Sequence, residues 1–186
     1  LAHHLSPGGV FLDIGANAGI YTLTAARAYA RLGGGRVLAV EANPTMQARL
    51  RYNVTLNRLD DQVELAPVAL SGRDGETEFS ISDDNLGESG LIATGGHSIR
   101  VPCKTLATLL AEHGIERLDG MKIDVEGMED VILMPFLAST PPTLLPRFII
   151  IEDSTRRWHE NLLGALTAQG YVLHARRKMN LVLTLG

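Results

Sequence analysis

A short apolar run that leads through an acid into a glycine-containing turn limits most strongly what this chain can fold into. The stretch "VFLDIGANAGIY" at residues 10–21 predicts a strand that ends near residue 14 and a helix that begins near residue 20. Gly15 lets the backbone turn sharply off the strand, and Gly19 lets the helix approach the sheet or a ligand closely. At such a junction we expect the backbone amides at the helix start to hold the polar end of a ligand beyond the strand tips.

The remainder of the chain alternates β-branched runs with longer helical patterns. We expect strands over 9–14, 36–41, 63–70, 121–125, 147–152, 171–175 and 181–185, and helices over 20–31, 44–59, 105–113, 128–137 and 155–169. This alternation predicts an α/β fold with a mostly parallel seven-stranded sheet covered by helices on both faces. The closing hairpin predicts that the last strand is antiparallel.

The segment 71–104 departs from this alternation because it is rich in glycine and serine. We expect it to form a β-hairpin insertion around a mobile loop at 83–96, which could close over a ligand as a lid. At 186 residues the chain is expected to be one domain, 1–186, that includes this insertion. It opens on Leu1 instead of methionine, so we expect an N-terminal extension to be missing.

Composition argues against several classes of partner. With 17 basic and 21 acidic residues and a formal charge of −4, the chain lacks the basic balance typical of nucleic-acid or anionic-membrane binding. Its apolar runs are too short to span a bilayer, and no secretory signal opens the sequence. Cys103 is the single cysteine and forms no internal disulfide, which suits a reducing, cytoplasmic location. The oligomeric state stays open.

Two acids near the first glycine turn indicate the charge of the ligand. Asp13 lies two residues before Gly15, where its carboxylate would repel a pyrophosphate and attract an ammonium or a sulfonium. Glu41 ends the second predicted strand, the usual place for an acid that accepts hydrogen bonds from ribose hydroxyls. A ligand with both a ribose and a cation is required, and S-adenosylmethionine meets both demands.

Other residues of the predicted cofactor site carry weaker signals. Asn17 is a candidate contact, with a simple turn-forming role as its alternative; it also stands where the middle glycine of the dinucleotide motif G-x-G-x-x-G belongs, which argues against NAD. Ala69 and Leu70 could flank an adenine by apolar contact or belong to the core. Asp13 could instead cap neighbouring amides, and Glu41 could be a solvated charge at a strand end.

The stretch "KIDVEG" at 122–127 predicts the catalytic acids. Lys122, Asp124 and Glu126 alternate, so on a buried strand they would share one side, either paired with one another or placed at its open tip. Glu152 ends the next strand and is expected to converge with Asp124. Asp124 or Glu152 is the candidate base that removes a proton from an acceptor hydroxyl. A magnesium ion held by the same acids is an alternative.

Four motifs resemble those of the FkbM-type S-adenosylmethionine-dependent methyltransferases: "DIGANAG" at 13–19, "VEANP" at 40–44, "ALSGRDG" at 69–75 and "KIDVEGMED" at 122–130. The resemblance runs over essentially the whole chain and implies a Rossmann-like seven-stranded methyltransferase sheet. It also implies methyl transfer to a hydroxyl oxygen of a small molecule or sugar, and it does not require a metal. An NAD-dependent oxidoreductase and a non-catalytic S-adenosylmethionine-binding module are the alternative functions.

Overall fold

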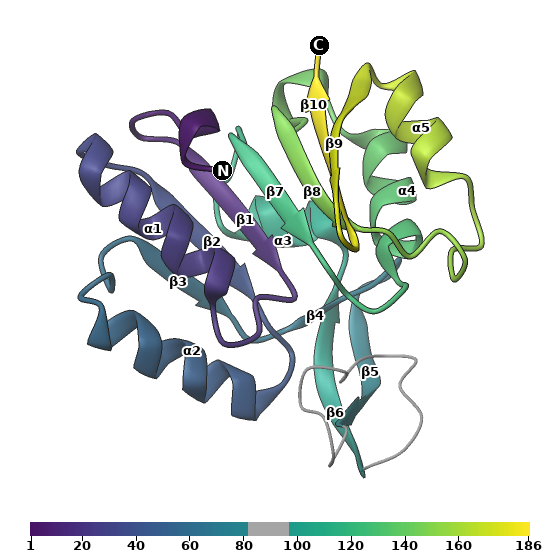
Figure 1. Cartoon of the computed structure of the whole chain (residues 1–186). Coiled ribbons are helices and arrows are strands. Elements are labelled where there is room, and N and C mark those ends of the chain that lie inside the picture. Colours follow the sequence, from purple (N-terminus) through teal and green to yellow (C-terminus); the bar gives the residue numbers. More distant parts are fainter. Residues whose placement is uncertain (82–96) are drawn as a thin grey trace.

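The fold is a seven-stranded sheet between two layers of helices, with a smaller sheet beside it (Figure 1). The computed structural model describes residues 1–81 and 97–186, so the expected loop at 83–96 lies outside the described residues. The strands of the large sheet follow the order β3-β2-β1-β7-β8-β10-β9. They are β1 (Val10–Ile14), β2 (Arg36–Val40), β3 (Val63–Ala66), β7 (Gly120–Ile123), β8 (Phe148–Glu152), β9 (Tyr171–Arg177) and β10 (Asn180–Leu185).

Strands β1, β2, β3, β7 and β8 pair in parallel, and β10 runs antiparallel to both β8 and β9. This arrangement confirms the predicted α/β class with an antiparallel last strand. Ile14 pairs with both Val40 and Ile123, and Ile123 also pairs with Ile151. The chain therefore leaves four neighbouring strands at the same edge of the sheet, which is where ligands bind in open α/β sheets.

Alternation along the strands divides the core into two layers. One face of the sheet packs against α1 (Ile20–Leu32) and α2 (Pro44–Leu56), and its strand residues include Phe11 and Val37. The other face packs against α3 (Leu106–Glu112), α4 (Glu129–Ser139) and α5 (Leu162–Ala168), with Leu12 and Leu38 among its strand residues. Because adjacent strand residues point to opposite faces, both layers are apolar and the strands read as continuous hydrophobic runs. None of the described helices has the length and apolar character needed to cross a bilayer.

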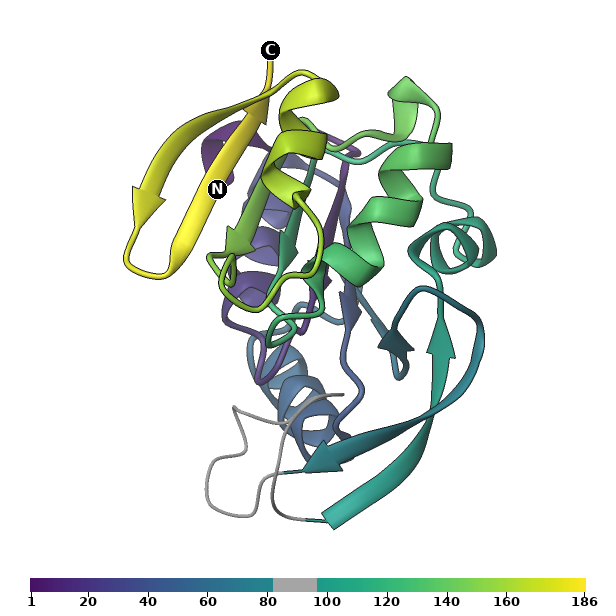
Figure 2. The same cartoon turned by 90° about the vertical axis from the view of Figure 1, so that its right-hand side faces the viewer.

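The smaller sheet corresponds to the predicted insertion and stands away from the main body (Figure 2). It contains β4 (Ala69–Leu70), β5 (Gly75–Ile81) and β6 (His97–Lys104) in the order β4-β6-β5, with β5 and β6 antiparallel. The expected single strand over 63–70 was wrong, because β3 and β4 belong to different sheets. Pro67 lies between them and has no amide hydrogen to continue a ladder.

Two further boundaries differ from the sequence prediction. The expected helix over 155–169 is shorter, since α5 begins only at Leu162 and the residues before it form turns. The amides of His159 and Glu160 donate to the buried carboxylate of Asp130 on α4, and the Asn161 side chain caps α5. Strand β7 ends at Ile123 instead of residue 125. Asp124 and Glu126 therefore follow the strand, and the expectation that they alternate with Lys122 along it was wrong.

Candidate active site

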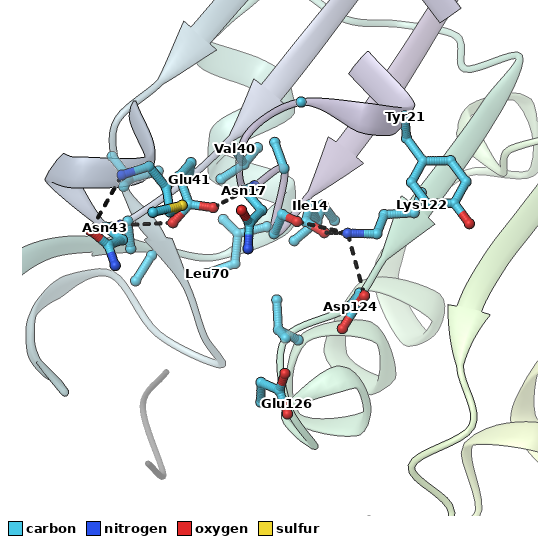
Figure 3. Close-up of a pocket in the computed structure, with 18 of the residues that line it drawn as sticks. Ile14, Asn17, Tyr21, Val40, Glu41, Asn43, Leu70, Lys122, Asp124 and Glu126 are labelled. Atoms are coloured by element: carbon cyan, nitrogen blue, oxygen red, sulfur yellow. Dashed lines mark hydrogen bonds and ion pairs between the residues drawn. The ribbon is translucent and has the colours of Figure 1, made fainter. Parts of the chain in front are cut away.

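A cavity of about 340 Å³ opens at the carboxyl ends of β1, β2 and β7 (Figure 3). The turn between β1 and α1 forms one wall, the start of α2 a second, and the loop between β7 and α4 a third. Residues from β4 and β5 of the smaller sheet close a further side. Of the predicted cofactor residues, Gly15, Asn17, Gly19, Glu41, Ala69 and Leu70 line the cavity, and so do the predicted catalytic residues Asp124 and Glu126.

The glycine turn brings two parts of the chain into backbone contact. Gly15 has φ +70°, and a Cβ atom placed on it would lie 2.0 Å from the carbonyl oxygen of Asp124. Gly19 has φ +98°, and its Cβ would lie 2.3 Å from the Leu50 side chain on α2. Both positions therefore need glycine for conformation and for space. The predicted close approach is present, and it packs the glycine turn against the loop after β7 and against α2.

The amides of this turn differ from the expected free donors. Every backbone N–H from residue 15 to residue 19 donates inside the chain: Gly15 and Ala16 to the Val40 carbonyl, Asn17 to Glu41, Ala18 to the Asn17 side chain, and Gly19 to the Ala16 carbonyl. The amides of residues 15–19 are therefore not free to hold the polar end of a ligand. The expectation concerned the amides at the helix start, and for the first residues of α1, from Ile20, it stays a prediction. A diphosphate-binding turn needs such amides free.

Glu41 is held from two sides at the tip of β2. Its Oε2 accepts from the Asn17 amide at 2.7 Å, and its Oε1 accepts from the Asn43 amide at 2.8 Å (Figure 3). Asn43 in turn caps α2 with its own side chain, as its position before Pro44 suggests. Burial raises the pKa of Glu41, against the two amides, which lower it. The carboxylate is thus fixed in orientation, and each oxygen keeps lone-pair capacity for a further donor.

The raised pKa of Glu41 predicts a specific pH dependence of stability. The folded protein keeps the proton of this carboxyl at pH values where the unfolded chain releases it, so the stability contributed by Glu41 is fully present below about pH 4.5. That contribution is lost as the pH rises through the folded-state pKa. We expect the free energy of unfolding of Glu41→Gln, minus that of the wild type, to increase over this window. Urea unfolding from pH 4 to pH 8 measures it, and a flat or falling difference would contradict the expectation.

The two residues predicted to flank an adenine form part of an apolar wall of the cavity. Ala69 and Leu70 line the cavity and are buried, and Val68 and Phe79 line the same side. Phe79 belongs to β5 of the smaller sheet, and the sequence analysis did not assign it to the site. Thr77, Phe79 and Ile81 alternate in the sequence, which is typical of a strand, but the sequence does not show which part of the structure Phe79 faces.

Asp13 lies behind the cavity wall. It is fully buried, is not among the residues that line the cavity, and accepts a 2.5 Å hydrogen bond from the Thr22 hydroxyl on α1. Burial raises its pKa, while the Lys122 ammonium and the Thr22 hydrogen bonds oppose that rise. The Lys122 Nζ lies 3.8 Å from Asp13 Oδ1 and 3.7 Å from Asp124 Oδ2. Asp13 is therefore linked to the cavity through its ion pair with Lys122, which lines the cavity. The sequence analysis considered Lys122 only as an ion-pair partner of the acids that follow it.

The predicted catalytic acids lie together but in different environments. Asp124 faces the cavity with 37% of its side chain exposed. Glu152 lies behind this surface, where it accepts from the Ser154 hydroxyl at 2.8 Å and pairs with Arg157 at 3.2 Å. Arg157 also pairs with Glu126 at 3.2 Å. Burial raises the pKa of Glu152, and the negative charges of Asp124 and Glu126 raise it further. The predicted convergence of these acids is present, with Arg157 between two of them.

Glu129 holds the loop that carries Asp124 in place through hydrogen bonds. This carboxylate, at the start of α4, is fully buried and accepts from the amides of Val125 and Gly127 at 3.0 and 3.3 Å. The Trp158 indole donates to its other oxygen at 2.7 Å. Glu129 thus sets the path of the loop behind Asp124. An acid two residues after a glycine, in the first turn of a helix, is the local signal that could have indicated this role.

Metal ligation has little support from this geometry. Within residues 1–81 and 97–186, no group of three or more His, Cys, Asp or Glu side chains is arranged to hold a metal ion. The acids that the magnesium alternative would use contact Lys122 and Arg157.

A parallel sheet with an antiparallel strand β10, helices on both faces and a cavity beyond β1 and β2 defines a Rossmann-like methyltransferase fold. The chain belongs to the FkbM methyltransferase family, because the model of the Methyltransferase FkbM domain matches residues 13–173. This match confirms the resemblance that the four sequence motifs indicated.

Individual proteins are similar to this chain in fold or in sequence. The methyltransferase FkbM from Methylobacillus flagellatus has a similar structure, with a TM-score of 0.59 at 14% identity over 98% of this chain and 44% of that chain. A putative O-methyltransferase from Klebsiella pneumoniae has a TM-score of 0.54 at 15% identity over 95% of this chain and 72% of that chain. The AMB antimetabolite synthetase AmbE of Pseudomonas aeruginosa is 30% identical over 168 residues, which cover 69% of this chain and 8% of that protein. The chain thus spans a small part of AmbE and under half of the Methylobacillus protein.

Proposed function

We propose that this chain binds S-adenosylmethionine in the cavity and methylates a hydroxyl oxygen of a small molecule or sugar. The observation that carries the proposal is the orientation of Glu41, whose two oxygens are held by the Asn17 and Asn43 amides at the cavity wall. A carboxylate fixed in this way can accept hydrogen bonds from both hydroxyls of a ribose. The apolar wall that contains Leu70 and Phe79 suits an adenine.

The charges of the cavity support a cationic ligand over a diphosphate. Among the described residues that line it, three carboxylates (Glu41, Asp124 and Glu126) stand against one ammonium, that of Lys122, which leaves a formal charge of −2. A negative cavity favours a ligand with a positive centre. The amides of residues 15–19 are already engaged, so they offer no cradle for the pyrophosphate of NAD.

Asp124 is the proposed base for the acceptor hydroxyl. S-adenosylmethionine supplies a methyl group on a sulfonium that is a good leaving group. As the acceptor oxygen bonds to carbon, the hydroxyl loses its proton to Asp124, and the carbon–sulfur bonding pair stays on sulfur. Asp124 suits this step because it lines the cavity and is partly exposed, whereas Glu152 is not among the lining residues. The Glu129 contacts hold the loop that positions it.

A thermal-shift comparison of three ligands tests the cofactor assignment. S-adenosylmethionine and S-adenosylhomocysteine are expected to raise the melting temperature, because a ligand at 100 times its Kd stabilises the folded state by about 2.7 kcal/mol. NAD is expected to leave the melting temperature unchanged. A shift with NAD alone would favour the oxidoreductase alternative and overturn the proposal.

Calorimetry of two variants locates the ligand. We expect Asp13→Ala and Glu41→Ala each to weaken S-adenosylmethionine binding, the first through Lys122 and the second by loss of the ribose contact. Glu116→Ala is the matched control, since Glu116 is an exposed acid that is not among the cavity-lining residues. Wild-type affinity in both test variants would show that the ligand does not bind in this cavity.

A further inference from the structure

Lys122 is the single basic residue among the described residues that line the cavity. It lies on β7 between two layers of buried apolar residues, with 6% of its side chain exposed. A buried ammonium is costly unless it is compensated, so its presence at the cavity wall needs a physical reason. Compensation of Asp13 provides one reason, since Nζ lies 3.8 Å from Asp13 Oδ1 while the Thr22 hydroxyl donates to Oδ2, but it does not require the ammonium to line the cavity.

The ammonium is held at the glycine turn by carbonyl groups. Its Nζ donates to the Gly15 carbonyl at 2.7 Å and to the Ile14 carbonyl at 3.3 Å (Figure 3). Asp13 and Asp124 lie at 3.8 and 3.7 Å, beyond ordinary hydrogen-bond length. An ammonium has three N–H donors, and the described residues provide hydrogen-bond acceptors for two of them. The two carboxylates and the Tyr21 ring, 5.7 Å from Nζ to its centroid, stabilise the positive charge. One N–H donor therefore lacks a hydrogen-bond acceptor among the described residues and can serve a ligand at the cavity wall.

The glycine turn offers a ligand anion no substitute for this ammonium. All amides from residue 15 to residue 19 donate to acceptors within the chain. An anionic group of a ligand at this end of the cavity would also meet the carboxylate of Asp124. A ligand with a carboxylate and an ammonium on the same carbon satisfies both signs, because its carboxylate meets Lys122 and its ammonium meets the net negative charge of the cavity lining.

We propose that Lys122 binds the carboxylate group of the ligand's amino-acid moiety and so selects zwitterionic ligands over their decarboxylated forms. This inference rests on the proposed function, in which the ligand is S-adenosylmethionine. It assigns to Lys122 a binding role and makes no use of the methyl-transfer step. It also gives Asp13, behind the wall, an indirect role, since its carboxylate lies 3.8 Å from the ammonium and stabilises that charge.

Binding of two ligands that differ in one carboxylate tests the inference. Isothermal titration calorimetry compares S-adenosylmethionine with decarboxylated S-adenosylmethionine, which keeps the sulfonium and the amino group. The wild type is expected to bind the carboxylate-bearing ligand about 10- to 100-fold more tightly, the range for a hydrogen bond between charged groups. In Lys122→Met this preference is expected to disappear. Lys178→Met, at an exposed lysine in the turn between β9 and β10, is expected to keep it.

Loss of the ammonium leaves Asp13 without its buried counter-charge, and this can prevent folding. The double variant Asp13→Asn/Lys122→Met removes both charges, and because the preference is a ratio within one variant, a general loss of affinity cancels. Equal affinity of the wild type for the two ligands would overturn the inference and leave the proposed function standing. A preference that persists without Lys122 would overturn it too. Wild type that binds neither ligand would reject the proposed function and the inference with it.

Discussion

Exchange of Asp124 for asparagine is expected to slow methyl transfer by about 10²- to 10⁴-fold, the usual contribution of a general base. Asparagine has nearly the same shape and keeps an acceptor oxygen, but it takes no proton from a hydroxyl. The affinity for S-adenosylmethionine is expected to change little. Transfer of a labelled methyl group to a panel of hydroxylated small molecules and sugars measures the rate, and calorimetry measures the affinity.

Glu152→Gln is the matched control for this experiment. Glu152 belongs to the same group of acids and has a pKa raised by burial and by its acidic neighbours, which suits a proton acceptor. However, it is not among the cavity-lining residues and is engaged by Ser154 and Arg157. We therefore expect a much smaller loss of rate than for Asp124→Asn. A larger loss in Glu152→Gln would transfer the role of base to Glu152, and unchanged rates in both variants would remove these acids from the proton transfer.

The parts of this structure that sequence predicted well depend on local signals. The positions of the strands at the cavity follow from apolar runs whose ends are clear, and Gly15 and Glu41 lie where two of these runs end. Parallel strands place such ends at one edge of the sheet, so residues far apart in the chain come together without detailed knowledge of packing. The FkbM family motifs coincide with these strand ends, which is why the family was recognisable as well.

The parts that sequence did not predict depend on contacts between loops. The segment at 155–161 has a helical pattern, but the Asp130 carboxylate binds the amides of His159 and Glu160 and holds the chain in turns. The sequence does not indicate acceptors for the amides of the glycine turn. In the structure three of them donate to Glu41 and to the Val40 carbonyl. In each case a polar group forms a hydrogen bond with a partner from another element of the chain. The hydrophobic periodicity of the sequence does not indicate such a partner.

Gly15→Ala is expected to destabilise the fold by about 3–5 kcal/mol, as the sum of two effects. Alanine at φ +70° adopts the left-handed region, which costs about 1–2 kcal/mol. Its Cβ would also lie 2.0 Å from the Asp124 carbonyl oxygen, a backbone atom that moves only if the whole loop moves. Because that loop carries the proposed base, we expect methyl transfer to fall together with stability. Urea unfolding measures the first effect and labelled methyl transfer the second.

Gly8→Ala separates the two contributions. Gly8 has the same φ of +70°, but a Cβ placed on it meets no atom within 4 Å. Its replacement should therefore cost only the conformational part, about 1–2 kcal/mol, and leave methyl transfer unchanged. Equal destabilisation by Gly15→Ala and Gly8→Ala would mean that the loop after β7 moves away from the new methyl group at little energetic cost. In that case the contact between Gly15 and Asp124 would not position the acid. The orientation of Asp124 would depend on the Glu129 contacts, on Lys122 and on the hydrogen bond from the Asp124 amide to the Ile14 carbonyl.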